Sequence, residues 1–225
     1  MTSFSDHAIL PSKEPIHHTF AVAMMNEFVS NLVFKGIQGT QPSNIDFFDI
    51  SLSTIQSGVS RISYKAAVET IAHFNEDFKK IKEDPKNKSQ TIVYLAGGSL
   101  GALYATGINY PIDCIREFRN KKNKKFEMTF KGAETFYADR VFGYIGFATS
   151  MGKFVPLLPK PKNHIQNYFL IQMSRFNGVL TAYPYKMIKY NVEFVPYVKN
   201  CLTSFAIKMI SSDLSCKVQK GIYGS

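Results

Sequence analysis

The pattern of apolar and polar positions is dominated by one stretch, Ser89 to Ile112, in which no residue carries a charge. A helix of this length can cross the hydrocarbon core of a bilayer, which is ~30 Å thick and needs roughly 20 residues. Within the stretch Gly97 and Gly101 have the spacing that lets helix backbones approach each other in a membrane. The pattern predicts a membrane-spanning helix with a packing face.

Five further apolar segments indicate helices of similar length, and each contains polar or charged positions. They run over about 18–34, 54–74, 141–159, 165–188 and 197–214. The mean hydropathy of the chain is only −0.10, which favours a bundle whose helices each keep a polar face inside. Residues 76–88 are a mixed run of charges with one proline, and they predict a solvated connection. The predicted fold class is therefore an all-α membrane protein.

The central helix ends in a short motif made of a proline and two charges. Pro111 is followed by Asp113 at position +2 and by Arg116 at position +5. A proline inside a helix kinks it, because its ring clashes with the carbonyl group one turn earlier and it has no amide hydrogen. Pro184 follows a second apolar segment in the same way, so we expect a kink there too.

Two further copies of the motif are recognisable, although each departs from it. After Pro184, Lys186 stands at the acidic +2 position and Lys189 at the basic +5 position. Near the N-terminus Ser30 takes the place of the proline, with Leu32 at the +2 position and Lys35 at the +5 position. All three copies keep the cation at +5. The repetition predicts three related units within the chain.

A proline motif of this form at the end of a glycine-spaced helix resembles the signature of the mitochondrial carrier family. In that family Pro-x-[Asp/Glu]-x-x-[Lys/Arg] closes each odd-numbered transmembrane helix. The resemblance implies a six-transmembrane-helix bundle of three pseudo-repeated helix pairs, located in the mitochondrial inner membrane as a multi-pass protein. The expected domains are an N-terminal arm, 1–15, and a carrier-like membrane domain, 16–225, with repeats at about 16–85, 86–160 and 161–225.

The resemblance also implies that the +2 acid of each repeat pairs with the +5 base of the next to close the matrix side. Asp113 is then left to pair with Lys189, whereas Leu32 supplies no acid for Arg116. Lys186 is expected to face Lys35 with like charge. At ~4 Å and an effective dielectric of about 20 each pair is worth on the order of 4 kcal/mol before desolvation. A closing ring with one attractive link predicts a protein that does not transport.

Charged side chains inside the predicted helices allow two interpretations. Arg61, Lys65 and Glu69 follow each other at intervals of four and therefore lie on one helical face. They form either an ordinary charge ladder on a soluble amphipathic helix or the lining of a water-filled cavity in a bundle. If the protein is a transporter, the expected substrate-binding residues are Arg61, Lys65 and Arg175.

The chain is strongly basic, with a formal net charge of +10. Such a charge suits an anionic lipid surface, anionic small molecules or nucleic acid. The densest basic segment, 119–131, predicts a loop on the side of the membrane that is not translocated, and nothing around it indicates a nucleic-acid module. Its last residues, Phe130, Lys131 and Gly132, resemble a carrier element that begins a helix and holds a cardiolipin phosphate, and this predicts a lipid site.

No pattern in the chain points to catalysis or to a metal. A metalloprotease motif, a nucleophile in a recognised turn and a spaced carboxylate pair are all missing from the sequence. The adjacent His17 and His18 point to different helix faces, and Cys114, Cys201 and Cys216 form no metal-binding pair. The expectation is a protein that is not an enzyme and has no cofactor apart from bound cardiolipin.

The favoured interpretation is a carrier-fold accessory subunit of a large mitochondrial inner-membrane complex, a respiratory-chain assembly above others, without transport activity. Its expected partners are cardiolipin, other membrane lipids and the remaining subunits of that complex, with no nucleic acid. One alternative is an active carrier for a small anionic metabolite. A second is a soluble basic scaffold or RNA-associated protein.

Overall fold

The structure is a computed structural model that describes residues 15–84, 89–120, 128–159 and 164–223. All regular elements in these ranges are helical. In chain order they are α2 (Ile16–Ile37), η1 (Pro42–Asn44), α3 (Phe47–Phe74), α4 (Glu76–Glu83), α5 (Gln90–Asn120), α6 (Phe130–Thr149), the π-helical turn η2 (Ser150–Phe154), η3 (Val155–Leu157), α7 (His164–Tyr190) and α8 (Phe194–Tyr223). The N-terminal arm, apart from Pro15, lies outside the described residues.

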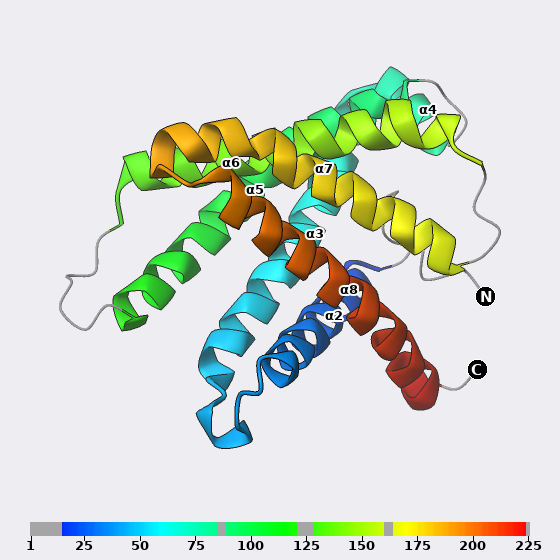
Figure 1. Cartoon of the computed structure of the whole chain (residues 1–225). Coiled ribbons are helices and arrows are strands. Elements are labelled where there is room, and N and C mark those ends of the chain that lie inside the picture. The colour runs from blue at the N-terminus through cyan, green and yellow to red at the C-terminus, as the bar shows by residue number, and fades with distance from the viewer. Residues whose placement is uncertain (1–14, 85–88, 121–127, 160–163, 224–225) are drawn as a thin grey trace.

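The six long helices pack in a closed order. Each of α2, α3, α5, α6, α7 and α8 packs on the long helix before and after it in the chain, and α8 returns to pack on α2 (Figure 1). Neighbours run in opposite directions: near the start of α3, Gln56 contacts Asn109 of α5, whereas further along, Val68 lies against Gly97. The all-helical class is confirmed, with six long helices in alternating directions.

Glycines decide how closely α5 approaches its neighbours. A Cβ atom on Gly101 would lie 2.8 Å from the Cα atom of Tyr64 in α3, and one on Gly98 would lie 2.8 Å from the Tyr144 ring of α6. A Cβ atom on Gly97 would likewise collide with the side chain of Val68 in α3. The predicted packing face of this helix is therefore confirmed.

The expected solvated connection over residues 76–88 is helical in its first part, where its charged side chains are mostly exposed but one apolar residue is not. Residues Glu76–Glu83 form the helix α4, whose Phe78 is buried and packs with Val68 and Val93. Ile81 lies one turn further on and adds to the same cluster. Two apolar residues at helical spacing outweighed the surrounding charges, because burying them stabilises the end of the α3–α5 pair.

Helix α3 begins earlier than the apolar pattern predicts. Its first residues, Phe47 to Asp49, stand before the expected start at residue 54 because Asp46 caps them.

The two motif prolines lie inside continuous helices. Pro111 lies inside α5, and Pro184 lies inside α7. The kinks at the two prolines remain predictions.

Within the described ranges one helix, Gln90–Arg119, is long and apolar enough to cross a membrane. Of its apolar window 44% is buried, and side chains on one face, among them Ile92, Leu103 and Ile108, are exposed. The described part of the chain thus offers one candidate membrane span where the sequence predicts six.

Candidate functional site: a polar cluster joining α3, α5 and α6

The site begins at the first turn of α3, where two acidic side chains are fixed side by side. The Oδ1 atom of Asp46 accepts hydrogen bonds from the backbone N–H groups of Phe48 and Asp49, both at 3.1 Å. The hydrogen bond from the Asp49 N–H lowers the pKa of the Asp46 carboxyl below its usual value, desolvation opposes this effect, and nearby Arg119 lowers the pKa further. This cap holds Asp49 in position toward α5.

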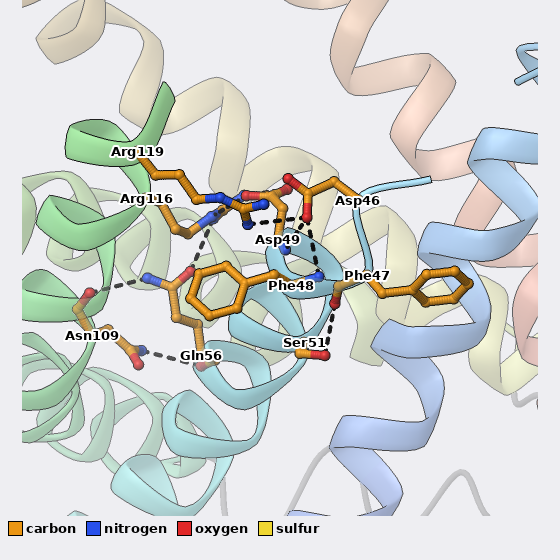
Figure 2. A network of polar contacts seen from close by, with 9 residues as sticks. All are labelled: Asp46, Phe47, Phe48, Asp49, Ser51, Gln56, Asn109, Arg116 and Arg119. Carbon is orange, nitrogen blue, oxygen red and sulfur yellow. Dashed lines mark hydrogen bonds and ion pairs between the residues drawn. The ribbon is translucent and has the colours of Figure 1, made fainter. Parts of the chain in front are cut away.

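Two arginines from the end of α5 meet these acids (Figure 2). Arg116 binds Asp49 with two bonds, from Nε to Oδ1 at 2.8 Å and from Nη2 to Oδ2 at 3.1 Å. Arg119 donates from Nη1 to Asp46 at 3.1 Å, and its guanidinium lies 4.6 Å from the centre of the Phe48 ring. Paired bonds of this kind fix orientation as well as distance, because both groups are planar.

The network continues inward through a reciprocal pair of amides. Arg116 donates from Nη1 to the Gln56 side-chain oxygen at 3.0 Å. Gln56 in turn donates to the backbone carbonyl of Asn109 at 3.0 Å, and Asn109 donates back to the Gln56 carbonyl at 3.1 Å. Asn109 is fully buried. Buried polar groups are costly unless paired, so these bonds bind the two helices in one register.

A serine carries the network on to α6. The Ser60 hydroxyl accepts from Asn109 at 3.0 Å and from Arg140 at 2.9 Å, while it donates to the Gln56 carbonyl. The guanidinium of Arg140 lies over the Phe136 ring, 4.5 Å from its centre. The α3–α5–α6 polar cluster consists of the polar residues described so far: Asp46, Asp49, Gln56, Ser60, Asn109, Arg116, Arg119 and Arg140.

A smaller cluster joins the other side of the bundle. The Lys186 ammonium in α7 lies 3.2 Å from the Asp139 carboxylate in α6. It also lies 5.8 Å from the ring centre of Tyr197 in α8, whose hydroxyl donates to the Val179 carbonyl at 2.7 Å. In both clusters a charged residue of the proline motif bonds to the long helix before its own, Arg116 of α5 to α3 and Lys186 of α7 to α6.

One expectation about the motif charges is wrong and one stays untested. Asp113 is not the only counterion for the motif cations, since Arg116 pairs with Asp49. Lys186 has Asp139 as its counterion, and its expected approach to Lys35 stays a prediction. Asp113 lies near Arg116 and Gln56, whereas the side chain of Lys189 lies outside the described part of the structure, so the Asp113–Lys189 pair stays a prediction.

The charges proposed to line a cavity lie at different levels of the bundle. Lys65 is buried, with 7% of its surface exposed, and Arg61 one turn earlier is half-buried. Glu69 pairs with Lys82 of α4 at 2.6 Å, so it belongs to the end of the bundle. Arg175 is half-buried on α7. Their role as substrate residues remains a prediction tied to the transporter alternative.

The expected lipid site is changed by the cap of α6. Phe130 is the first residue of the helix and is largely exposed, but the Gly132 amide donates to the Thr129 hydroxyl at 3.0 Å. That amide is therefore occupied, and the glycine is needed because Tyr110 packs against it. The Lys131 side chain and the basic residues of 121–127 lie outside the described part. A lipid site here stays a prediction without the Gly132 amide as a phosphate donor.

Sequence reasoning missed the partners supplied by α3. Asp46 carries a readable signal, because an aspartate directly before an apolar run is a common helix cap. Gln56 and Asn109 carry none that links them, since they stand 53 positions apart and their pairing depends on which helices become neighbours.

Comparison with protein-family models, curated proteins and solved structures found no match to this chain. The resemblance to mitochondrial carriers therefore rests on the motif residues. Among the described side chains, no three of the His, Cys, Asp and Glu residues come together as metal ligands would. The geometry assembled here is suited to holding helices in place.

Proposed function

We propose that this protein is a structural membrane subunit that holds one conformation and moves no solute. The observation that carries the proposal is the paired bonding of Arg116 to Asp49, extended through Gln56 to the buried Asn109. The motif base that a carrier would use in a switchable closure is here part of a fixed joint between two neighbouring helices.

The energetics of this joint argue against alternating access. Arg116 and Asp49 are 28% and 38% exposed, so water screens their pair and its coupling is worth about 1 kcal/mol. The larger cost falls on the buried Asn109, because a buried polar group left without its partner costs about 1–3 kcal/mol. Separating α3 from α5 would break the bonds of Arg116 and expose those between Gln56 and Asn109 at the same time. A transporter must pay such a cost in every cycle, whereas a structural subunit never opens the joint.

A membrane location is supported by the distribution of side chains on α5. Its exposed face is apolar and carries Ile92, Leu103, Tyr104, Ile108, Ile115 and Phe118. Its buried face carries small and polar residues, among them Ala102, Thr106 and Asn109. Apolar residues outside and polar residues inside suit a helix that faces lipid.

We further propose that the protein lies in the mitochondrial inner membrane as part of a large complex, a respiratory-chain assembly above others. The support is the motif resemblance together with six long helices in alternating directions, which is the arrangement that the resemblance implies. Partner subunits would cover those helices whose exposed faces carry charges. Bound cardiolipin remains part of the expected surroundings.

Three measurements test the proposal on the full-length protein. Alkaline carbonate extraction of mitochondrial membranes should leave the protein in the pellet. Native gel separation after mild detergent extraction should place it far above its own 25.4 kDa. Purified protein in vesicles should show no exchange of nucleotides, phosphate, keto acids or amino acids. Saturable uptake that disappears in Arg61→Ala or Lys65→Ala would overturn the proposal in favour of an active carrier.

A further inference from the structure

A groove opens between α2 and α3, on the side of α2 away from the α3–α5–α6 polar cluster. Its volume is about 330 Å³, and it is lined by Met24, Met25, Phe28, Ser51, Thr54 and Ile55. Glu27 lies near Arg116 of the cluster, whereas Met25, two positions earlier, points to the opposite face of α2. Phe28 at the rim is 38% exposed, so the groove belongs to the outer surface of the bundle.

Thr54 brings one hydroxyl group without a partner to this apolar groove. Only 5% of the residue is exposed, and its Oγ1 atom has no hydrogen-bond partner among the described residues. Other helical threonines, such as Thr70 and Thr106, donate to the carbonyl group four positions earlier, at 2.8 and 2.7 Å. Ser51, the other hydroxyl of the groove, donates to Phe47 in the same way. A buried hydroxyl without a partner is costly, so Thr54 needs an acceptor from outside this chain.

The depth of Thr54 in the proposed membrane protein indicates which acceptor can reach it. Gln56 bonds to Asn109 and the two helices are antiparallel, so Thr54 lies level with Pro111. The uncharged run of α5 ends one residue later, and this marks the edge of the ~30 Å hydrocarbon core. At this edge the acyl chains of glycerolipids join the polar interfacial region through their ester carbonyl groups. An ester therefore offers a hydrogen-bond acceptor attached to an apolar chain, at the level of the hydroxyl group.

The size of the groove favours an acyl chain over a helix. One turn of an α-helix rises 5.4 Å with a diameter of about 10 Å, so it fills roughly 420 Å³, which is more than the whole groove. A single acyl chain is thinner and can lie along apolar walls. Met24 and Met25 have unbranched, flexible side chains, which can rearrange around such a chain and let its carbonyl group reach Thr54.

We propose that the groove between α2 and α3 binds one acyl chain of a membrane glycerolipid, with the Thr54 hydroxyl donating a hydrogen bond to its ester carbonyl group. The chain extends toward Met24, which packs at Gly58, one turn deeper than Thr54. The recognised group is uncharged, unlike the phosphate expected at Phe130 to Gly132. This inference rests on the proposed function, because only a protein within the bilayer meets acyl chains at this depth.

A single tryptophan can report on the groove, because the chain contains none. Phe28→Trp is reconstituted in nanodiscs with phosphatidylcholine whose brominated chains are attached by ester bonds or by ether bonds, which lack the carbonyl group. Bromine quenches tryptophan fluorescence at short range, and the ester lipid should quench at a mole fraction at least threefold lower than the ether lipid. Adding Thr54→Val, which keeps the shape of the side chain, should abolish this preference. Thr70→Val, whose hydroxyl group is bonded within α3, should leave it unchanged.

Native mass spectrometry of the protein without tryptophan gives a second measurement. Retained lipid should be at least threefold lower in Thr54→Val than in the wild type and in Thr70→Val. Equal quenching by the two lipids in Phe28→Trp, or lipid retention unaffected by Thr54→Val, overturns the inference.

Leu103→Trp, on the exposed face of α5, separates failure of the inference from failure of the proposed function. If this tryptophan is quenched while that of Phe28→Trp is shielded from both lipids, a second copy of the chain covers the groove and the inference alone fails. If neither tryptophan is quenched, the protein does not lie in the bilayer, and the proposed function fails as well.

Discussion

The α3–α5 and α6–α7 pairs are both antiparallel and both bring two backbones close at a glycine, but they differ in what surrounds that contact. An extended network of polar side chains joins α3 to α5, with Arg116 and Asn109 at the centre. Between α6 and α7 glycines from both helices face each other, with a Cβ atom on Gly146 placed 2.8 Å from the Cα atom of Gly178, and the polar contacts there are separate ones, such as those of Asn177 and Lys186. A polar joint can adjust and responds to salt and pH, whereas a contact between backbones allows no added atom.

The largest effect is expected where the backbone of α7 meets that of α6. A methyl group on Gly178 would collide with the carbonyl oxygen of Gly143, which cannot move aside, so Gly178→Ala should lower the free energy of unfolding by about 3 kcal/mol. Gly143→Ala is the matched control. Its Cβ atom would lie 3.9 Å from the Gly178 oxygen, and helix propensity should make it neutral or more stable by up to about 1 kcal/mol.

Denaturant titration in detergent micelles measures both changes. Equal destabilisation by the two alanines would show that the close contact between α6 and α7 does not limit stability. It would also remove the contrast between the two helix pairs.

The next effect concerns the charged joint between α3 and α5. Arg116→Ala and Asp49→Ala should each cost about 1–2 kcal/mol, because each leaves a charged partner without its paired bonds. The two side chains are 28% and 38% exposed, so water screens them and the coupling energy in a double-mutant cycle should be about 1 kcal/mol. High salt should reduce that coupling, and strict additivity of the two substitutions would contradict the joint.

A smaller effect is expected at the second cluster. Lys186→Met keeps the length of the side chain but removes its charge beside Asp139, and it should lower stability by less than about 1 kcal/mol. The loss should disappear when Asp139 is already replaced by Asn. The melting temperatures of Lys186→Met, Asp139→Asn and the double variant measure this effect. If Lys186→Met alone is as stable as the wild type, the pair contributes nothing to stability.

The smallest effect is a pH dependence that comes from the cap of α3. Asp46 has a pKa below the 3.8 of the unfolded chain, so the ionised carboxylate stabilises the folded protein. This contribution is fully present above about pH 4 and is lost as the pH falls through the lowered pKa. The melting temperature of the wild type should therefore fall more steeply below pH 4 than that of Asp46→Asn, and parallel curves would exclude the effect.

Much of the helical order follows from local patterns in the chain. Apart from its first residue, the uncharged run from residue 89 to residue 112 lies within α5, and the glycines at 97 and 101 form its packing face as expected. The helix boundaries were less predictable, since the cap at Asp46 extends α3 beyond its apolar segment. The burial of Phe78 escaped prediction because it requires the neighbouring ends of two other helices.

The sequence by itself determined the six long helices, the basic character of the chain and the positions of the proline motifs, because propensity, apolar spacing and charge act over a few residues. The tertiary structure decided which charges meet. The motif pattern left Arg116 without an acid, yet it binds Asp49, 67 positions away, because α3 and α5 pack in one particular register. The same packing encloses Gly101 and leaves Gly107 open, although both are glycines of one helix. Partner choice depends on distances that exist only after the helices have assembled.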